Sequence, residues 1–230
     1  PQQFKQMVMI SGFDKYFQIA PCFRDEDGRA DRSPGEHYQL DIEMSFVEQE
    51  DVFKVVEPIF YDLFKEFGKG KKINKAPFRR IKYKESLEKY GTDKPDLRNP
   101  IELVDVTNIF KSPNVKLKIF KDIIAKGGIV KAIPVNNTAS KPRSFFDGLN
   151  NWAISEGASG LAYITFEKSG NKIVAKGPIA KFFSESAVSE LIKICKITVK
   201  DSVFFVCNSQ KEATKFSGIA RQKIANEMKI

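Results

Sequence analysis

Residues 37–47 read HYQLDIEMSFV, and apolar and polar side chains alternate along them. A period of two sends alternate side chains to opposite faces of a β-sheet. One face carries Gln39, Asp41 and Glu43, and the other carries apolar residues that we expect to pack a core. Residues 16–23 (YFQIAPCF) form a preceding strand, which the charged loop RDEDGRADRSPGE joins to the second. The sequence therefore predicts a β-hairpin with one polar face.

The polar face has two interpretations. It is either a solvated surface of an exposed hairpin or the wall of a functional site, with Arg24 at the end of the first strand. Composition excludes some classes of protein: 42% hydrophobic and 29% charged residues are typical of a globular chain. No apolar run approaches the roughly 20 residues that span a bilayer, and no signal peptide opens the sequence. We expect a soluble, cytoplasmic protein without a membrane partner.

The rest of the chain mixes helical and strand patterns, so the fold class is α+β. Residues 51–68 have an apolar stripe at helical spacing, which we expect to lie in a core. Beyond Asn99 the two patterns alternate. Strands are predicted at 129–135, 161–167 and 202–207. Helices are predicted at 142–157, 185–196 and 209–228. The turn-rich segment GTDKPDLRNP separates the two parts, and we place the domain boundary there, between residues 98 and 99.

Cysteine and histidine usage gives no metal motif. Cys22, Cys195 and Cys207 are widely spaced in apolar runs, and we interpret them as reduced core residues. The only histidine, His37, begins a strand, where a structural role is the usual one. No metal ligand is predicted.

The net charge of +9 is unevenly distributed. Residues 1–98 hold 18 basic and 18 acidic side chains, whereas residues 99–230 hold 20 basic and 11 acidic ones. An excess of basic residues in one part favours a polyanionic partner. Solubility alone is the other explanation.

Three ordered segments resemble one enzyme family. FRDEDGRADRSPGEHYQLDIEMSF resembles motif 2 of the class II aminoacyl-tRNA synthetases, in the form found in bacterial aspartyl-tRNA synthetases. PQQFKQMVMISGFDKYFQIA resembles the aspartate-binding segment of the same family, and YGTDKPDLRNP is also typical of it. The loop SPGEH departs from the family pattern, so no role is implied for Ser33 or Gly35.

The resemblance implies a reaction and its residues. The family activates L-aspartate with ATP, which carries Mg²⁺, and transfers the aspartyl group to the 3′ end of tRNA. Arg24 would be the catalytic arginine that contacts both the aspartate carboxylate and the α-phosphate. The implied aspartate-binding residues are Gln2, Lys5, Arg24, Gln39 and Asp41. The implied ATP-binding residues are Arg24, Asp25 and Glu26, and the implied contacts to the tRNA acceptor end are Arg29 and Arg32.

The resemblance also implies a domain arrangement. Residues 1–98 would form part of the antiparallel catalytic sheet with its flanking helices, and residues 99–230 would form the separate α+β insertion domain of the bacterial enzymes. Motifs 1 and 3 and the anticodon-binding barrel lie outside this sequence. We therefore expect a fragment of a homodimeric aspartate–tRNA ligase that is inactive by itself. Two alternatives stay open: an enzyme that charges tRNA(Asn) as well as tRNA(Asp), and a non-catalytic tRNA-binding or regulatory module.

Overall fold

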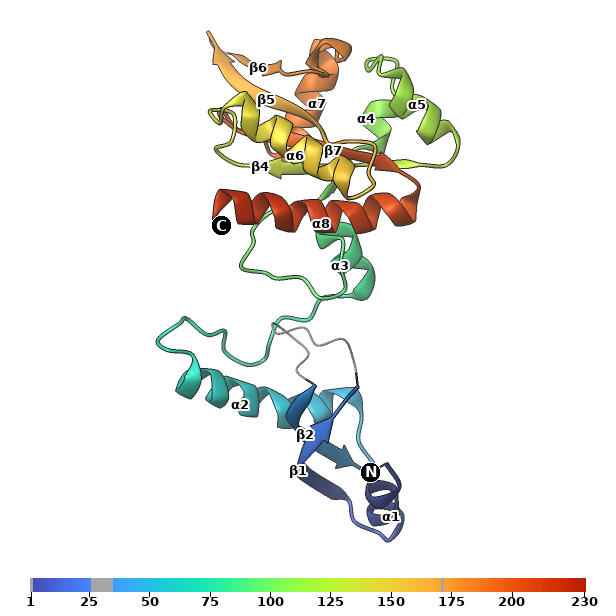
Figure 1. Ribbon diagram of the computed structural model, residues 1–230, viewed down its shortest axis with the longest axis vertical. Coiled ribbons are helices and arrows are strands. Elements are labelled where there is room, and N and C mark those ends of the chain that lie inside the picture. The colour runs from blue at the N-terminus through green and yellow to red at the C-terminus, as the bar shows by residue number, and fades with distance from the viewer. Residues whose placement is uncertain (1, 26–34, 171) are drawn as a thin grey trace. The chain divides into compact units, whose positions relative to one another are not determined.

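A computed structural model of the protein describes residues 2–25, 35–170 and 172–230 (Figure 1). The chain is α+β, as the sequence predicts, and its strands pair in antiparallel fashion. It divides into two compact units, the N-terminal unit Pro1–Arg80 and the C-terminal unit Ile81–Ile230. No helix within the described ranges is long and apolar enough to cross a membrane.

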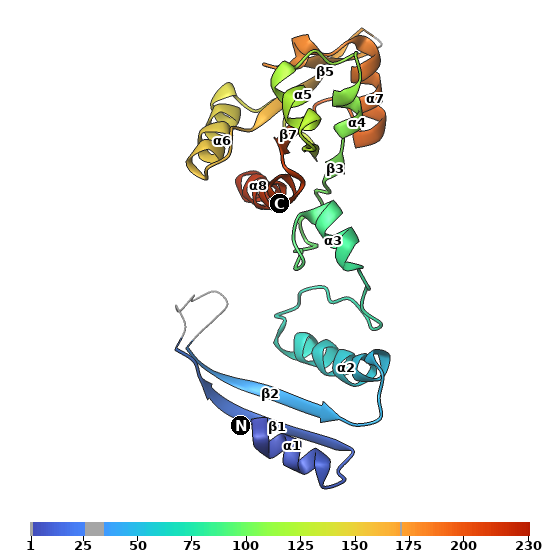
Figure 2. The same cartoon turned by 90° about the vertical axis from the view of Figure 1, so that its right-hand side faces the viewer.

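The N-terminal unit is built around the predicted hairpin. Its elements are α1 (Gln2–Ile10), β1 (Lys15–Phe23), β2 (Glu36–Met44) and α2 (Gln49–Phe67). β1 and β2 pair along their whole length, from Lys15 opposite Met44 to Phe23 opposite Glu36. β2 ends three residues earlier than predicted, because the chain turns at Phe46, whose φ is 55°. α1 contacts β1 (Figure 2).

The structure leaves the apolar face of the hairpin open, which is the opposite of our expectation that this face packs a core. The polar face, with Gln18, Gln39 and Asp41, is half-buried. The apolar face is open in this chain and packs no core. Its largest side chains are exposed by 69% at Phe17, 67% at Ile19, 74% at Phe23 and 77% at Tyr38. Strand periodicity assigned side chains to faces correctly, but it gave no information on which face another element covers.

Helix α2 begins with a local backbone contact. The Asp51 carboxylate accepts a hydrogen bond from the Glu48 N–H at 3.2 Å. Asp51 therefore caps the helix from within its first turn and does not occupy the cap position itself. The buried Glu57 accepts bonds from the Phe78 N–H and from the Arg80 guanidinium, which holds the following segment against the helix. The apolar stripe of α2 is largely open rather than in a core, with exposed side chains at Phe60, Leu63, Phe64 and Phe67.

The C-terminal unit is a five-stranded sheet with helices on both faces. The strand order is β3-β4-β7-β5-β6. The strands are β3 (Val104–Asp105), β4 (Ile129–Val135), β5 (Ala162–Ser169), β6 (Lys172–Lys176) and β7 (Ser202–Asn208). The helices are α3 (Tyr83–Tyr90), α4 (Thr107–Lys111), α5 (Lys118–Ala125), α6 (Arg143–Ser155), η1 (Ala180–Phe182), α7 (Glu185–Cys195) and α8 (Gln210–Met228).

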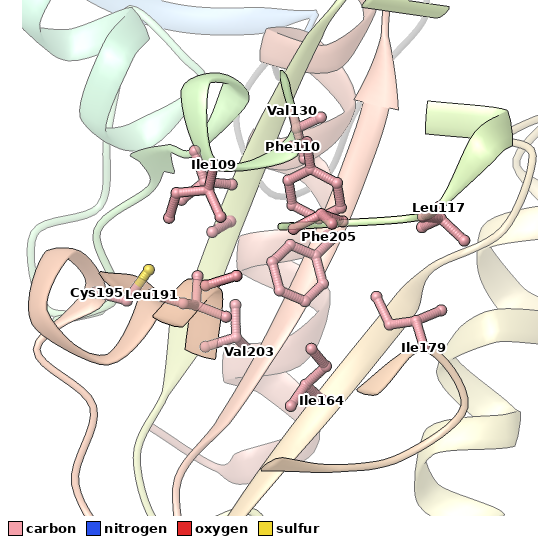
Figure 3. Packing of buried hydrophobic residues seen from close by; sticks show 14 of the residues in the cluster. Ile109, Phe110, Leu117, Val130, Ile164, Ile179, Leu191, Cys195, Val203 and Phe205 are labelled. Atoms are coloured by element: carbon pink, nitrogen blue, oxygen red, sulfur yellow. The ribbon is translucent and has the colours of Figure 1, made fainter. Parts of the chain in front are cut away.

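Each face of this sheet has its own buried cluster. α4, α5 and α7 cover one face (Figure 2). There Phe110 packs against Phe205 (Figure 3), and its ring also contacts the rings of Phe120 and Phe183. α6 and α8 cover the other face. There Phe146 and Leu149 are buried, as the helical pattern predicts, and Trp152 stacks on Phe216 of α8. All the predicted strands and helices of this part are present.

The GTDKPDLRNP segment is held by a buried arginine on α8. Arg221 is 2% exposed, and its guanidinium donates to the carbonyls of Ile101 at 2.6 Å, Asn99 at 2.6 Å and Asp96 at 3.0 Å. Burial lowers the pKa of this guanidinium, and the three carbonyls offset its loss of hydration. The segment therefore packs within the C-terminal unit. The expected domain division at residues 98 and 99 concerns the parent enzyme and stays a prediction.

A second contact brings α3 and α8 together. Gly91 follows α3 with φ 71°, and a Cβ added to it would lie 2.5 Å from the Gly218 nitrogen of α8. Only glycine permits this approach of two backbones.

The cysteines are free, and they differ in environment. Cys195 is buried, and burial raises the pKa of its thiol to about 12. Cys207 is half-buried, with its thiol pKa raised by burial to about 11. Cys22 is not a core residue: it lies on the polar face of the hairpin.

We predict that Arg221→Met destabilises the C-terminal unit by roughly 2 to 4 kcal/mol, because three buried carbonyls lose their donor. Urea unfolding followed by fluorescence of Trp152, the only tryptophan, measures this unit. Arg143→Met is the control, since Arg143 is exposed and its ion pair with Asp147 lies at the surface. Equal urea midpoints for the two variants would contradict the prediction.

Candidate active site

The polar face of the hairpin carries an open hollow of about 390 Å³. Its lining comes from α1, β1 and β2 and from the residue just after β1. Of the residues that the sequence predicts for a site, the structure brings these to the hollow: Gln2, Lys5, Arg24, Gln39 and Asp41. The other lining residues are Gln18, Ala20, Pro21 and Cys22.

Strand register explains this grouping. Antiparallel pairing puts Gln18 opposite Asp41 and Ala20 opposite Gln39, and cross-strand partners share a face. Arg24 follows Cys22 by two residues and so continues the same face beyond the end of β1. Its backbone N–H donates to the Gly35 carbonyl at 2.8 Å, which fixes where the side chain leaves the hairpin. The small side chain of Ala20 leaves the middle of the hollow open.

An ion-pair network closes one end of the hollow. Lys5, from α1, places its Nζ 3.1 Å from Asp41 Oδ2 and 2.7 Å from Glu43 Oε1. The side chains of Lys5 and Asp41 are only 17% and 16% exposed. Gln18 Nε2 donates to Asp41 Oδ2 at 3.2 Å and so holds the same carboxylate from the neighbouring strand.

The network shifts both titrating groups toward their charged forms. The hydrogen bonds that Lys5 donates to Glu43 and then to Asp41 raise the pKa of Lys5, and the hydrogen bonds that Asp41 accepts from Lys5 and then from Gln18 lower the pKa of Asp41. Asp41 therefore stabilises the fold above the pKa of the unfolded carboxyl, and this contribution is lost as pH falls through the folded pKa. For Lys5 the contribution is present below the unfolded pKa and is lost as pH rises through the folded one.

The arrangement suits a ligand with charges of both signs. Arg24 and Lys5 supply two cations, and Asp41 supplies an anion on the same face. An ammonium has three N–H donors, whereas Lys5 contacts two carboxylates here. A ligand carboxylate can therefore reach Lys5 while a ligand ammonium reaches Asp41. Gln39 supplies an amide between them, and its Oε1 lies 3.7 Å from the Cys22 sulfur.

The other predicted residues fall outside this grouping. Asp25 is exposed and is not among the residues that line the hollow. Glu26, Arg29 and Arg32 lie outside the described residues. Within the described part of the chain, no three His, Cys, Asp or Glu side chains come together in a way that could hold a metal ion.

Sequence reasoning missed Gln18. It occupies an apolar-looking strand, YFQIAPCF, where a single amide carries no motif. Its significance follows from its register position opposite Asp41, which a sequence alone does not give. Glu43, which the sequence pattern places on the same polar face, contacts Lys5 directly.

The segment that forms this hairpin is the one whose sequence resembles motif 2 of the class II aminoacyl-tRNA synthetases, and comparison with known proteins agrees. Residues 1–229 match the family described as tRNA synthetases class II (D, K and N), and the chain belongs to this family. Its sequence is also highly similar to those of several aspartate–tRNA(Asp/Asn) ligases. It is 56% identical over 230 residues to the aspartate–tRNA(Asp/Asn) ligase of Pelagibacter ubique, covering 100% of this chain and 38% of that protein.

Two further relatives carry the same name. The chain is 53% identical over 228 residues to the protein from Beijerinckia indica, covering 99% of this chain and 38% of the relative. It is 56% identical over 230 residues to the protein from Rickettsia bellii, covering 100% of this chain and 37% of the relative. The chain thus spans less than two fifths of the length of these relatives.

We predict that Lys5→Met raises the pKa of Asp41 relative to the unaltered chain, because the strongest hydrogen bond to its carboxylate is removed. Carbon-detected NMR titration of the aspartate carboxyl groups measures the change. Lys54→Met is the matched control: Lys54 pairs with Asp51 at 2.9 Å, so this variant should raise the pKa of Asp51 and leave Asp41 unchanged. An Asp41 titration that is identical in Lys5→Met and the unaltered chain would refute the assignment.

Proposed function

We propose that this chain is the amino-acid-binding and ATP-binding part of an aspartate–tRNA ligase. The parent enzyme would join L-aspartate to ATP, release pyrophosphate and pass the aspartyl group to the 3′ end of tRNA(Asp). The observation that carries the proposal is the shared hollow of Arg24, Lys5, Gln39 and Asp41. The names of the relatives support the same reaction and add tRNA(Asn) as a second acceptor.

Aspartate has three charged groups that match the hollow. We assign its side-chain carboxylate to Lys5, its ammonium to Asp41 with Gln2 nearby, and its α-carboxylate to Arg24 and Gln39. Lys5 discriminates against asparagine, because a neutral amide cannot replace a carboxylate beside a half-buried ammonium without loss of the charge pairing. Glu43 keeps its ion pair with Lys5 while Asp41 exchanges its contact with Lys5 for one with the ammonium of aspartate.

The chemical step needs two anions to approach each other. A carboxylate and an α-phosphate about 4 Å apart repel by roughly 4 kcal/mol at an effective dielectric constant of 20. A guanidinium that contacts both removes this opposition and stabilises the charge that develops at phosphorus. Arg24 has the planar fork that this requires, whereas lysine would offer a single point charge.

No general base is assigned, since the attacking carboxylate is already an anion. Asp25 and Glu26 are assigned to ATP, which brings Mg²⁺ bound to its phosphates, and Arg29 and Arg32 are assigned to the tRNA acceptor end. Homodimer formation and a cytoplasmic location stay predictions. The alternative of a non-catalytic tRNA-binding module is less favoured, because such a module has no need for a paired Lys5–Asp41 site with an arginine beside it.

For Arg24→Ala in the intact enzyme we predict a fall of at least about 100-fold in aspartate-dependent ATP–pyrophosphate exchange, with an unchanged fold. Arg79→Ala, an exposed arginine of the same unit, should retain exchange within about threefold. Near-normal exchange in Arg24→Ala would remove this residue from the mechanism. Charging of a tRNA(Asn) transcript by the unaltered enzyme decides between the two acceptor sets.

For Gln18→Leu we predict about a tenfold rise in the KM for aspartate with little change in kcat, because Asp41 loses a hydrogen bond worth about 1.5 kcal/mol that positions its carboxylate. Gln6→Leu, at an exposed position on α1, is the control. In an Asp41→Asn background the Gln18 substitution should have no further effect on KM. An additive effect there would mean that Gln18 acts independently of Asp41.

A further inference from the structure

Five lysines gather at one corner of the C-terminal unit. This lysine surface consists of Lys111, Lys116, Lys118, Lys121 and Lys181. It lies where α4, the start of α5 and η1 meet. The first four lysines belong to the segment KSPNVKLKIFK, which contains no aspartate or glutamate.

Backbone contacts fix the segment beside η1. The Lys116 N–H donates to the Phe182 carbonyl at 2.8 Å, and Val115 pairs with Phe183 in an antiparallel bridge. Lys116 and Lys181 therefore lie on neighbouring segments. At the other end, Lys121 donates from Nζ to the Ser112 carbonyl at 3.0 Å, so its ammonium lies at the backbone of the residue that follows Lys111.

The surface rests on a rigid base. Val115 is 0% exposed and Leu117 is 9% exposed, and both belong to the cluster that contains Phe110 (Figure 3). Lys116 and Lys118 each follow one of these buried residues in the chain, so their backbone is fixed while their side chains are exposed. Ile119, which is 69% exposed, follows Lys118 in the first turn of α5.

The charges of this surface are not neutralised. Throughout residues 2–25, 35–170 and 172–230, no carboxylate lies within 4.0 Å of any of the five ammonium groups. The nearest acids in sequence, Asp122 and Glu185, are exposed and make no ion pair with them. Some other lysines of the unit are paired: Lys84 with Glu88, Lys89 with Glu85, Lys176 with Glu167 and Lys223 with Glu227.

We propose that the lysine surface binds the phosphate backbone of the tRNA that the parent enzyme charges. This inference rests on the proposed function, and it names the part of the C-terminal unit that meets the polyanion. Unpaired lysines on a fixed base suit phosphates, since binding releases condensed counterions and no existing ion pair must first be broken. Backbone contacts of this kind position RNA without reading its sequence.

The test uses the 230-residue chain and a fluorescent tRNA(Asp) transcript, with affinity measured by anisotropy between about 50 and 200 mM KCl. One variant replaces the four exposed lysines of the surface: Lys111→Gln, Lys116→Gln, Lys118→Gln and Lys181→Gln. Lys121 is retained because it bonds the backbone. The control variant removes the same net charge from paired lysines: Lys84→Gln, Lys89→Gln, Lys176→Gln and Lys223→Gln.

We expect the surface variant to bind tRNA at least about tenfold more weakly at low salt. The slope of log affinity against log salt should fall by about 3, at roughly 0.7 to 0.9 per phosphate contact. The control variant should lose less than about threefold. An equal loss in both variants would mean that net charge alone matters, and an unchanged surface variant would also overturn the proposal.

Anionic phosphatidylglycerol vesicles are the second probe. Loss of vesicle binding by the surface variant, with tRNA binding retained, would assign the surface to a membrane and overturn the proposal. Aspartate-dependent ATP–pyrophosphate exchange needs no tRNA, so the intact enzyme with the four surface substitutions should keep it. If the unaltered enzyme showed no exchange, the proposed function would be refuted but the proposed tRNA contact would not. The comparison of tRNA affinity between the surface and control variants does not depend on exchange activity.

Discussion

The pairing register of β1 and β2 determines whether this chain has a site at all. Because strand side chains alternate with a period of exactly two residues, a shift of one residue would send Gln39 and Asp41 to the opposite face. The observed register puts Gln18 against Asp41, and the Lys5 ammonium from α1 completes the contact at 3.1 Å. The ion pair and the register stabilise each other, since Lys5 can reach Asp41 on one face only.

The two units differ in how many of their described apolar residues are buried. Among the residues that the structure describes, every buried apolar residue lies in the C-terminal unit, beginning at Tyr90, and the only buried residue of the N-terminal unit is Glu57. The C-terminal unit therefore has the two-sided core of a stable domain. The N-terminal unit is held by strand pairing, by the Lys5 network and by the contacts of Glu57. Its site geometry depends on electrostatics to an unusual degree.

Much of the fold followed from sequence patterns, and the exceptions have physical reasons. Long periodic segments such as Gln210–Met228 and Ile129–Val135 were predicted, because their apolar spacing is set by the core they fill. The two-residue strand at Val104 and the short helix at Lys118 were not, since tertiary pairing rather than local pattern creates them. The site residues came from a motif. Gln18 could not be predicted in this way, because its hydrogen-bond partner Asp41 lies 23 positions away in the sequence. Only the strand register brings the two side chains together.

The open apolar face of the hairpin bears on how the site works. A two-stranded hairpin by itself is marginally stable in water, and contiguous exposed apolar side chains mark a surface that another element covers. Phe17, Ile19 and Tyr38 stand directly behind the polar face that carries Gln18, Gln39 and Asp41. Whatever covers the apolar face also fixes the strand twist beneath the hollow. Packing on one side of the hairpin and the geometry of the hollow on the other are therefore coupled through the same backbone.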